Sequence, residues 1–339
     1  MTATKTDQNS VKKSKIGPFQ FKTQPEYVYS TAIIIGYFIT IYGLFTFPYS
    51  LSKKTILWNF AIGLFAKFGE TAGVHRLWSH RSYKAKLPLR IFLLLCYYLT
   101  FWYKAIDWIK FHRVHHKYTD TDADPHNTKR GFFYSHVGWI MLKKHPEVKR
   151  RIKEHDFSDI YNDPVLTIGE KYFIPLGLTL SIIIPTLVPV YYWNETWKTA
   201  LWAVFLRYSI GANVTGTINS FAHFYGNKPY DRDITSVENR ILSIITLGEG
   251  WHNYHHVFPF DYKAGELPIY PFNMTTLFLD MFAKIGWAYD LKTASAEMIQ
   301  KRVKRTGDGT HHLWGWGDQD QLPEEKEQVI ITHQSKLNH

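Results

Sequence analysis

Two matching clusters, His-Arg-Val-His-His at residues 112 to 116 and His-Asn-Tyr-His-His at residues 252 to 256, dominate this sequence. A third cluster, His-Arg-Leu-Trp-Ser-His, occupies residues 75 to 80. On an α-helix, positions i, i+3 and i+4 share one face, so each H-x2-H-H cluster can direct three imidazoles to the same side. His75 and His80 are five residues apart, which on a regular helix separates the two side chains by about 140°. We therefore expect a helix to end or distort between them and to close the site from its terminus.

The three clusters supply more imidazole nitrogens than one metal ion binds, because zinc usually takes four ligands and transition metals commonly take at most six. The sequence therefore predicts two metal ions held by His75, His80, His112, His115, His116, His252, His255 and His256. Neutral imidazole binds iron, copper, nickel and zinc, so the ligand type leaves the metal open. A ninth candidate is His223, which follows Asn219 by four residues, so both can face the same site. The other histidines are interpreted as surface or hydrogen-bonded polar residues.

Long apolar stretches predict an all-α integral membrane protein. Of the 339 residues, 45% are hydrophobic, and they concentrate in segments long enough to cross a hydrocarbon core of about 30 Å. One of these segments contains a single charge, Arg207, and another contains Lys67 and Glu70, which can pair at the i, i+3 spacing. The four predicted spans are residues 28–47, 56–74, 172–193 and 201–221.

Four crossings in two hairpins place all three histidine clusters on one side of the membrane. The segment from His75 to Lys171 is rich in Lys and Arg, whereas the loops near Ser50 and Glu195 carry few. The positive-inside rule makes the histidine side cytosolic. Residues 91–102 are apolar but too short to cross, so we expect them to lie in the interface or to pack inside.

Composition also excludes several classes of function. The formal charge of +11 fits an anionic membrane surface and a phosphate-bearing substrate better than nucleic acid, for which no binding module is recognisable. The single cysteine, Cys96, cannot form an intrachain disulfide. Neither G-x-G-x-x-G nor a P-loop occurs, so electrons for any redox chemistry must come from an external carrier. Residues 1–25 and 318–339 are polar and are expected to be flexible tails around a domain at 26–317.

The histidine boxes closely resemble those of animal acyl-CoA desaturases of the stearoyl-CoA type, especially those of insects. The resemblance includes Glu-Gly-Trp ahead of the third box and the segment Ala-Asp-Pro-His-Asn-Thr-Lys-Arg-Gly-Phe-Phe-Tyr-Ser-His-Val-Gly-Trp at residues 123 to 139. It runs from about Glu26 to Trp316 and matches in residue, order and spacing. The domain at 26–317 is thereby identified as a membrane fatty acid desaturase domain.

The resemblance implies four transmembrane helices under a cytosolic helical cap that encloses a di-iron site. It assigns one iron to His75, His80, His112, His116 and His255, and the other to His115, His223, His252 and His256, with Asn219 acting through a water. No catalytic residue is implied beyond these ligands. The implied reaction introduces a double bond into a saturated fatty acyl-CoA, at Δ9 or, as in insect pheromone enzymes, at Δ11. It uses O2 and two electrons from cytochrome b5, in the endoplasmic reticulum membrane.

Substrate contacts are also carried over by position. Trp139, Lys143 and Lys144 match channel and phosphate-binding positions. Gly216 stands where a tryptophan usually lies beside the acyl chain, and Gly63 where a bulky residue often lies near the far end of the channel. The polar coenzyme A contacts usual around the second box are replaced here by Phe101-Trp102-Tyr103 and Lys110-Phe111.

Alternative functions remain open from the residues alone. A di-iron membrane lipid hydroxylase would use similar histidine boxes and the same oxygen chemistry. A histidine-rich membrane receptor or metal transporter belongs to another class, but a transporter would place its ligands along a membrane-crossing path. An inactive desaturase relative that serves as a binding protein is a further alternative.

Overall fold

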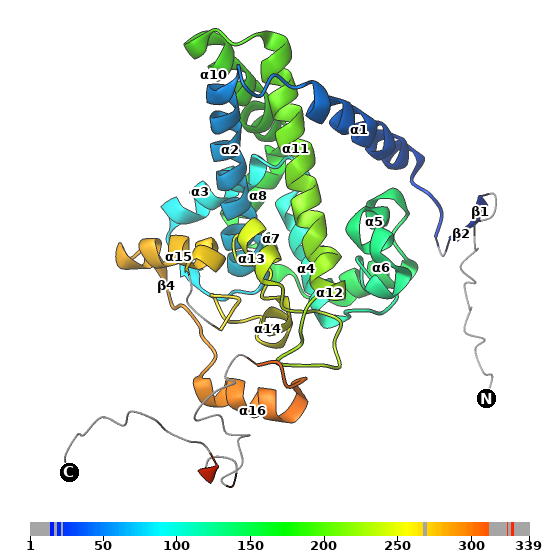
Figure 1. Cartoon of the computed structure of the whole chain (residues 1–339), viewed down its shortest axis with the longest axis vertical. Helices are drawn as coiled ribbons and strands as arrows, with labels where there is room; N and C mark the ends of the chain where they lie inside the picture. Colours follow the sequence, from blue (N-terminus) through cyan, green and yellow to red (C-terminus); the bar gives the residue numbers. More distant parts are fainter. Residues whose placement is uncertain are drawn as a thin grey trace.

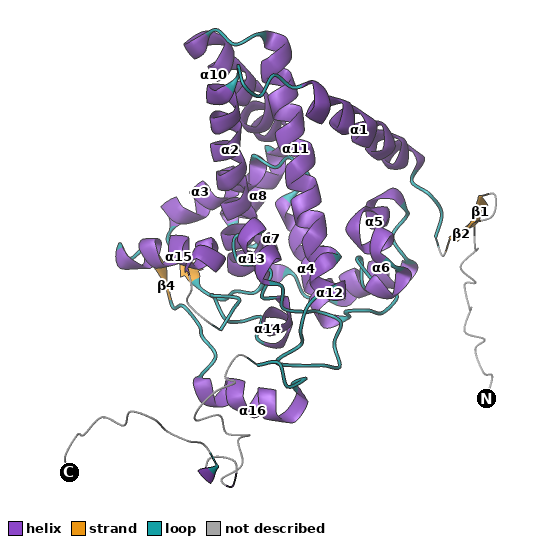
Figure 2. Cartoon of the chain, in the orientation of Figure 1, coloured by secondary structure: helices purple, strands orange, loops and turns teal. Residues whose placement is uncertain are grey.

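The computed structural model describes residues 14–16, 19–21, 23–266 and 270–311, with residues 324, 327 and 328. The described chain is mostly helical, and its few strands are short (Figure 2). β1 (Ser14–Ile16) pairs antiparallel with β2 (Phe19–Phe21), and β3 (Lys84–Ala85) pairs antiparallel with β4 (Ala288–Tyr289). Most of the two predicted tails, 1–25 and 318–339, lies outside the described residues.

Each predicted span coincides with a long helical segment. The first is α1 (Tyr27–Thr46), and the second is α2 (Lys53–Phe68), which continues into η1 (Gly69–Ser79). The third is a continuous run of α9 (Phe173–Leu178), η4 (Thr179–Ile183) and α10 (Ile184–Trp193), and the fourth is α11 (Trp197–Asn219). Two of the four, Tyr27–Thr46 and Phe173–Trp193, are long and apolar enough by themselves to cross a membrane.

The apolar helices and the cap occupy opposite ends of the molecule (Figure 1). α2, α10 and α11 stand side by side in the upper half, and α1 leaves them at an angle. Large apolar side chains of α1 point outward, for example Val28, Phe38 and Phe45, whose exposed fractions are 80%, 71% and 86%. This outward-facing apolar surface is what a helix in contact with lipid presents.

Arg207, Lys67 and Glu70, the charged residues inside the apolar helices, are hydrogen-bonded to local partners. The guanidinium of Arg207 donates to the carbonyl oxygens of Leu99 at 3.0 Å and Ser181 at 2.5 Å. The predicted pair of Lys67 and Glu70 is confirmed, with 2.7 Å between Nζ and Oε2, and Thr215 bonds to both side chains. These contacts explain how apolar segments tolerate charges.

The cap is built from short helices around one apolar core that includes Leu93, Tyr97, Ile109, Leu166 and Leu279. One face of α3 (Leu87–Tyr98) lies in this core, whereas Ile91 and Leu95 are exposed, so the expected packing inside holds for one face of this segment. The remaining cap helices are α4 (Ala105–Lys117), η2 (Thr128–Arg130), η3 (Tyr134–Gly138), α5 (Trp139–Met141), α6 (Pro146–Glu154), α7 (Ser158–Tyr161), α8 (Pro164–Lys171), α12 (Phe221–Phe224), α13 (Arg240–Ile245), α14 (His252–Val257), η5 (Tyr270–Phe272), α15 (Met274–Lys284) and α16 (Ala296–Thr306).

Glycine permits the contact between η1 and α3 that joins the two halves of the molecule. A Cβ atom on Gly69 would lie 2.0 Å from the backbone nitrogen of Tyr97, a distance that no side chain can occupy. The backbones of the two helices therefore touch at this point. The close approach fixes the position of η1, which carries the first histidine cluster.

Candidate metal centre

The three histidine clusters lie on three separate helices. η1 carries His75 and ends at His80, whose backbone N–H donates to the carbonyl of His75 at 3.1 Å. This i to i+5 bond is that of a π-helix, which turns more slowly than an α-helix. The expected distortion between His75 and His80 is thereby confirmed. α4 carries the second cluster and α14 the third, so both H-x2-H-H clusters are helical, as their spacing predicts.

The helices bring nine histidine side chains together into two groups. Within each group, the candidate ligand atoms all lie within 4.8 Å of one another. The first group is His75, His80, His112, His116 and His255; the second is His115, His223, His252 and His256. These groups have the same members as the two ligand sets that the family resemblance implies. Asn219, the last residue of α11, precedes His223 on α12.

Opposed ring nitrogens occur throughout the two groups. In the first, the Nε2 atom of His255 lies 2.9 Å from that of His75 and 3.1 Å from that of His116. In the second, the Nε2 atom of His252 lies 3.0 Å from those of His223 and His256. Nitrogens at this separation either share a proton or direct their lone pairs at a common point.

The hydrogen bonds behind His223 fix the tautomer of this ring in the second group. The single hydroxyl hydrogen of Thr235 is donated to the Asp120 carboxylate at 2.7 Å. Thr235 must therefore accept from the Nδ1 atom of His223, which lies 2.8 Å away. A neutral His223 then carries its proton on Nδ1 and presents a bare lone pair from Nε2. Lone pairs that converge in this way fit a bound cation.

Carboxylates contact the Nδ1 atoms of two of the imidazoles, His115 and His75. Asp124 accepts from the Nδ1 atom of His115 at 2.8 Å, which leaves the Nε2 lone pair of that ring free for a metal. Glu249 lies 3.0 Å from the Nδ1 atom of His75 and is also paired with Arg76 at 2.8 Å. Neither carboxylate is among the site residues predicted from the sequence. Their positions could have indicated them, because Asp124 follows the second box and Glu249 stands three residues before the third.

Burial and mutual repulsion keep most of these rings neutral. Burial, followed by neighbouring imidazoles, holds the pKa of His80, His112, His116 and His255 well below the ordinary value of histidine. Neutral imidazole is the form that binds a metal. His115 differs, because burial lowers its pKa but Asp124 more than reverses this effect. Burial also raises the pKa of Glu249, yet Arg76 and His75 bring it down to about 2, so Glu249 is an anion.

Buried polar side chains fix the helices that carry the histidines. Arg113, which follows His112, donates to the carbonyls of Trp78 at 2.6 Å and Ser79 at 3.1 Å and so ties α4 to the end of η1. Asn253, which follows His252, accepts from the backbone of Tyr230 at 2.9 Å and donates to the carbonyl of Asp231 at 2.9 Å. The residue next to the first histidine of a box therefore positions its helix.

The predicted substrate residues Trp139 and Lys144 form one aromatic cluster. The ring of Trp139 stacks on Tyr103, with 5.8 Å between the ring centroids, and meets the ring of Phe111 edge to face at 6.4 Å. The Lys144 ammonium lies 3.9 Å from the centroid of Trp139 and donates to its carbonyl at 2.8 Å. Lys143 is exposed and bonds to Gln24 at 3.2 Å. Tyr103 and Phe111 are two of the residues that, by the family resemblance, stand in place of polar coenzyme A contacts.

The two glycines differ in their surroundings. A Cβ atom on Gly216 would lie 3.0 Å from both the ring and the carbonyl oxygen of His136, so His136 fills the space beside this glycine. His136 is held there by Ser220 at 2.9 Å and Asn213 at 3.2 Å. At Gly63, the nearest atom to an added Cβ is Cγ of Arg207, 3.8 Å away.

Comparison with known proteins agrees with the geometry. The protein-family model described as "Fatty acid desaturase" matches residues 53–272. An acyl-CoA Delta(11) desaturase of Spodoptera littoralis is 54% identical over 301 residues, which cover 88% of this chain and 89% of the relative. An acyl-CoA Delta-9 desaturase of Acheta domesticus is 49% identical, with 86% and 81% covered, and stearoyl-CoA desaturase 5 of Bos taurus is 47% identical, with 80% of each chain covered. The chain therefore belongs to the fatty acid desaturase family.

Proposed function

We propose that this protein is a membrane-bound acyl-CoA desaturase that introduces a double bond at Δ9 or Δ11 of a saturated fatty acyl chain. The observation that carries the proposal is the pair of histidine groups, whose nine rings converge from η1, α4, α12 and α14. In the overall reaction, two neighbouring CH2 groups lose two hydrogens, while O2, two electrons and two protons give two molecules of water. The names of the relatives, acyl-CoA Delta(11) and Delta-9 desaturases, support this substrate class and this reaction.

The cofactor proposed is two iron ions, one in each histidine group. Iron in such a site activates O2 for removal of hydrogen from an unactivated C–H bond, chemistry that side chains alone cannot supply. The protein's part is to hold the ligands. Asp124 and Thr235 set the tautomers of His115 and His223, and Asn219 is proposed as a ligand through water. His75 is positioned by Glu249.

The coenzyme A phosphates are proposed to bind near Lys143 and Lys144. A lysine binds phosphate as a point charge, and Lys143 already faces solvent. The Lys144 ammonium instead lies over the ring of Trp139. To bind a phosphate, the ammonium must either move off this ring or bind the phosphate beside it. The aromatic cluster of Tyr103, Phe111 and Trp139 then offers ring faces to the bound substrate.

We further propose that the acyl channel passes Gly216 and Gly63. Because His136 fills the space beside Gly216, a tryptophan at 216 cannot be added without moving His136. Gly216→Trp should therefore lower turnover or shift the product profile toward 16- and 18-carbon substrates, with iron retained. An unchanged profile at an unchanged rate would remove position 216 from the channel.

The proposed location is the endoplasmic reticulum membrane, with four spans at residues 28–47, 56–74, 172–193 and 201–221 and with the metal groups on the cytosolic side. The apolar exposed surface of α1 and the basic character of the cap support this arrangement. The sequence contains no nucleotide-binding motif, so an external electron donor is required. Cytochrome b5 is the donor that the family resemblance implies.

Product analysis tests the function. Expression in desaturase-deficient yeast, followed by mass spectrometry that locates the double bond, should give Δ9 or Δ11 monounsaturated products. His255→Ala, which removes a ligand of the first group, should abolish them. Hydroxylated products would contradict desaturation, and full activity of His255→Ala would contradict the assigned metal site.

A further inference from the structure

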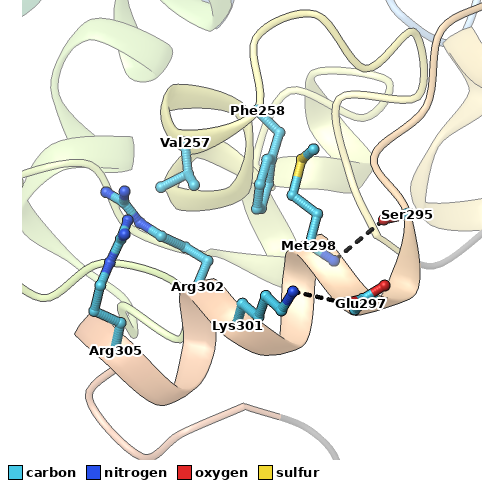
Figure 3. A pocket seen from close by; sticks show the side chains of 8 residues that line it. All are labelled: Val257, Phe258, Ser295, Glu297, Met298, Lys301, Arg302 and Arg305. Carbon is cyan, nitrogen blue, oxygen red and sulfur yellow. Dashed lines mark hydrogen bonds and ion pairs between the residues drawn. The ribbon is translucent and has the colours of Figure 1, made fainter.

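A groove on the outer face of the cap lies directly behind the third histidine box. It has a volume of about 430 Å³ and runs between the end of α14 and one face of α16. Its floor is apolar and its rim is basic (Figure 3). The lining residues are Val257, Phe258, Ser295, Glu297, Met298, Lys301, Arg302 and Arg305.

The cations of this groove are only partly neutralised. Met298, Lys301, Arg302 and Arg305 are spaced i, i+3, i+4 and i+7 on α16 and therefore share a face. Arg302 is paired with Asp231, and Lys301 pairs with Glu297 in full solvent exposure, where an ion pair contributes little. Arg305 makes no ion pair with any residue that the structure describes, and its side chain lines the same groove as Arg302 (Figure 3). Two guanidinium groups that line one groove with an apolar floor attract an anion.

The floor of the groove is covalently continuous with the metal ligands. Val257 ends α14 and is bonded to His256, which belongs to the second histidine group. The ring of Phe258 packs at a tilt against that of Tyr254, with ring centroids 5.0 Å apart, and Tyr254 precedes His255. The end of α14 thus lines the groove while the histidines of this helix belong to the metal groups, so α14 is a short route for electrons.

Two other anionic occupants, a membrane surface and the coenzyme A of the substrate, fit the position of the groove less well. α16 lies at the end of the molecule farthest from α10 and from the top of α2, so the groove faces away from the apolar helices and from a membrane around them (Figure 1). The lysines proposed for coenzyme A, Lys143 and Lys144, lie beside α6 in another part of the cap. A partner in the aqueous phase can reach the groove from the side of the cap that faces away from the apolar helices.

We propose that the groove between α14 and α16 docks the acidic face of the one-electron carrier that reduces the metal centre. This inference rests on the proposed function, which requires an external donor. The basic rim would steer the carrier by charge, and the apolar floor would seat it within one helix of His255 and His256.

Charge reversal in the groove tests the proposal with a matched control. The groove variant is Lys301→Glu/Arg305→Glu, which leaves Arg302 and its partner Asp231 in place. The control is Lys149→Glu/Lys153→Glu on α6, two exposed lysines with the same i, i+4 spacing and the same change in net charge. The probe is the soluble haem domain of cytochrome b5, whose oxidation is followed with full-length desaturase, O2 and acyl-CoA.

The KM for the haem domain should rise about tenfold in the groove variant and stay within about twofold in the control, with acyl-CoA KM unchanged in the groove variant. Product formed in a single turnover by dithionite-reduced enzyme should be equal in all three proteins. An unchanged donor KM in the groove variant, or an equal rise in the control, would overturn the proposal. A rise confined to acyl-CoA KM would also overturn it, because the groove would then bind substrate.

Two further measurements test whether the C-terminal segment of this chain occupies the groove and whether the proposed function itself holds. The segment from residue 318 carries several acids, including Asp318, Asp320, Glu324 and Glu325. If that segment occupies the groove, truncation after Gly317 will abolish the difference between wild type and groove variant, which would overturn docking of a separate carrier. A persistent difference supports it. Absence of product from dithionite-reduced wild type would instead refute the proposed function itself.

Discussion

Asp124 accepts from the Nδ1 atom of His115 at 2.8 Å and also accepts the backbone N–H groups of Asp120 and His126, each at 2.9 Å. Asp124→Asn keeps the size of the side chain but removes its charge and places an amide donor in the site. Because such partners orient metal ligands, the affinity for iron should fall by about 10- to 100-fold. Iron retained during dialysis against a graded chelator measures this loss. Asp156→Asn, at an exposed carboxylate, is the control, and equal retention in both variants would contradict the role of Asp124.

Lys144 predicts a dependence of substrate binding on pH. Burial lowers the pKa of its ammonium to about 7, although Glu26 raises it, and Arg130 lowers it further. Only the protonated lysine attracts phosphate, and its fraction falls as pH rises through 7. The KM for acyl-CoA should therefore increase between about pH 6 and pH 8. Lys144→Arg keeps its charge over this range and should flatten the profile.

A second variant shows how the acyl-CoA KM behaves when both lysine charges are reversed. Lys143→Glu/Lys144→Glu should raise the acyl-CoA KM at every pH, with iron retained. If Lys144→Arg shows the same pH dependence as wild type, another group is responsible and the assignment to Lys144 fails.

At the scale of elements, the contact between η1 and α3 positions the first histidine cluster. A Cβ atom on Gly69 would lie 2.0 Å from the backbone of Tyr97, whereas one on Gly73 would lie 3.3 Å from side-chain atoms of Leu93 and Trp78. Gly69→Ala should therefore cost about 3 kcal/mol of unfolding free energy and displace His75, and Gly73→Ala should cost about 1 kcal/mol. Thermal unfolding in detergent and iron content check both variants. Equal stability of the two would contradict the backbone contact.

The helices of the site could be predicted from the sequence because their signal is local. The i, i+3, i+4 spacing placed His112 and His252 on regular helices, and the five-residue spacing after His75 indicated the distortion that the π-helical bond produces. Contacts between distant segments gave no such signal. Glu249 is 174 residues from His75, and His136 is 80 residues from Gly216. Such pairs are set by the packing of η1 against the segment before α14 and of η3 against α11, which no local pattern specifies.

At the scale of the whole molecule, the segregation of apolar helices from a basic cap predicts the topology. Ser50 lies between α1 and α2, at the end opposite the cap, whereas Lys149 lies on α6 in the cap. In sealed microsomes, a membrane-impermeant thiol reagent should label Lys149→Cys and should label Ser50→Cys only after permeabilisation. Wild type is the control, because its one cysteine, Cys96, is buried. Labelling of Ser50→Cys in sealed vesicles would contradict the two-hairpin arrangement.

The metal content of the purified protein tests the central claim most directly. Two converging groups of five and four histidines should hold two iron ions per chain, one in each group. Elemental analysis of the full-length protein, expressed with iron and purified without chelator, should give two irons per chain, and His115→Ala should reduce this number. A reproducible single ion per chain, or zinc in place of iron in an active preparation, would contradict the account.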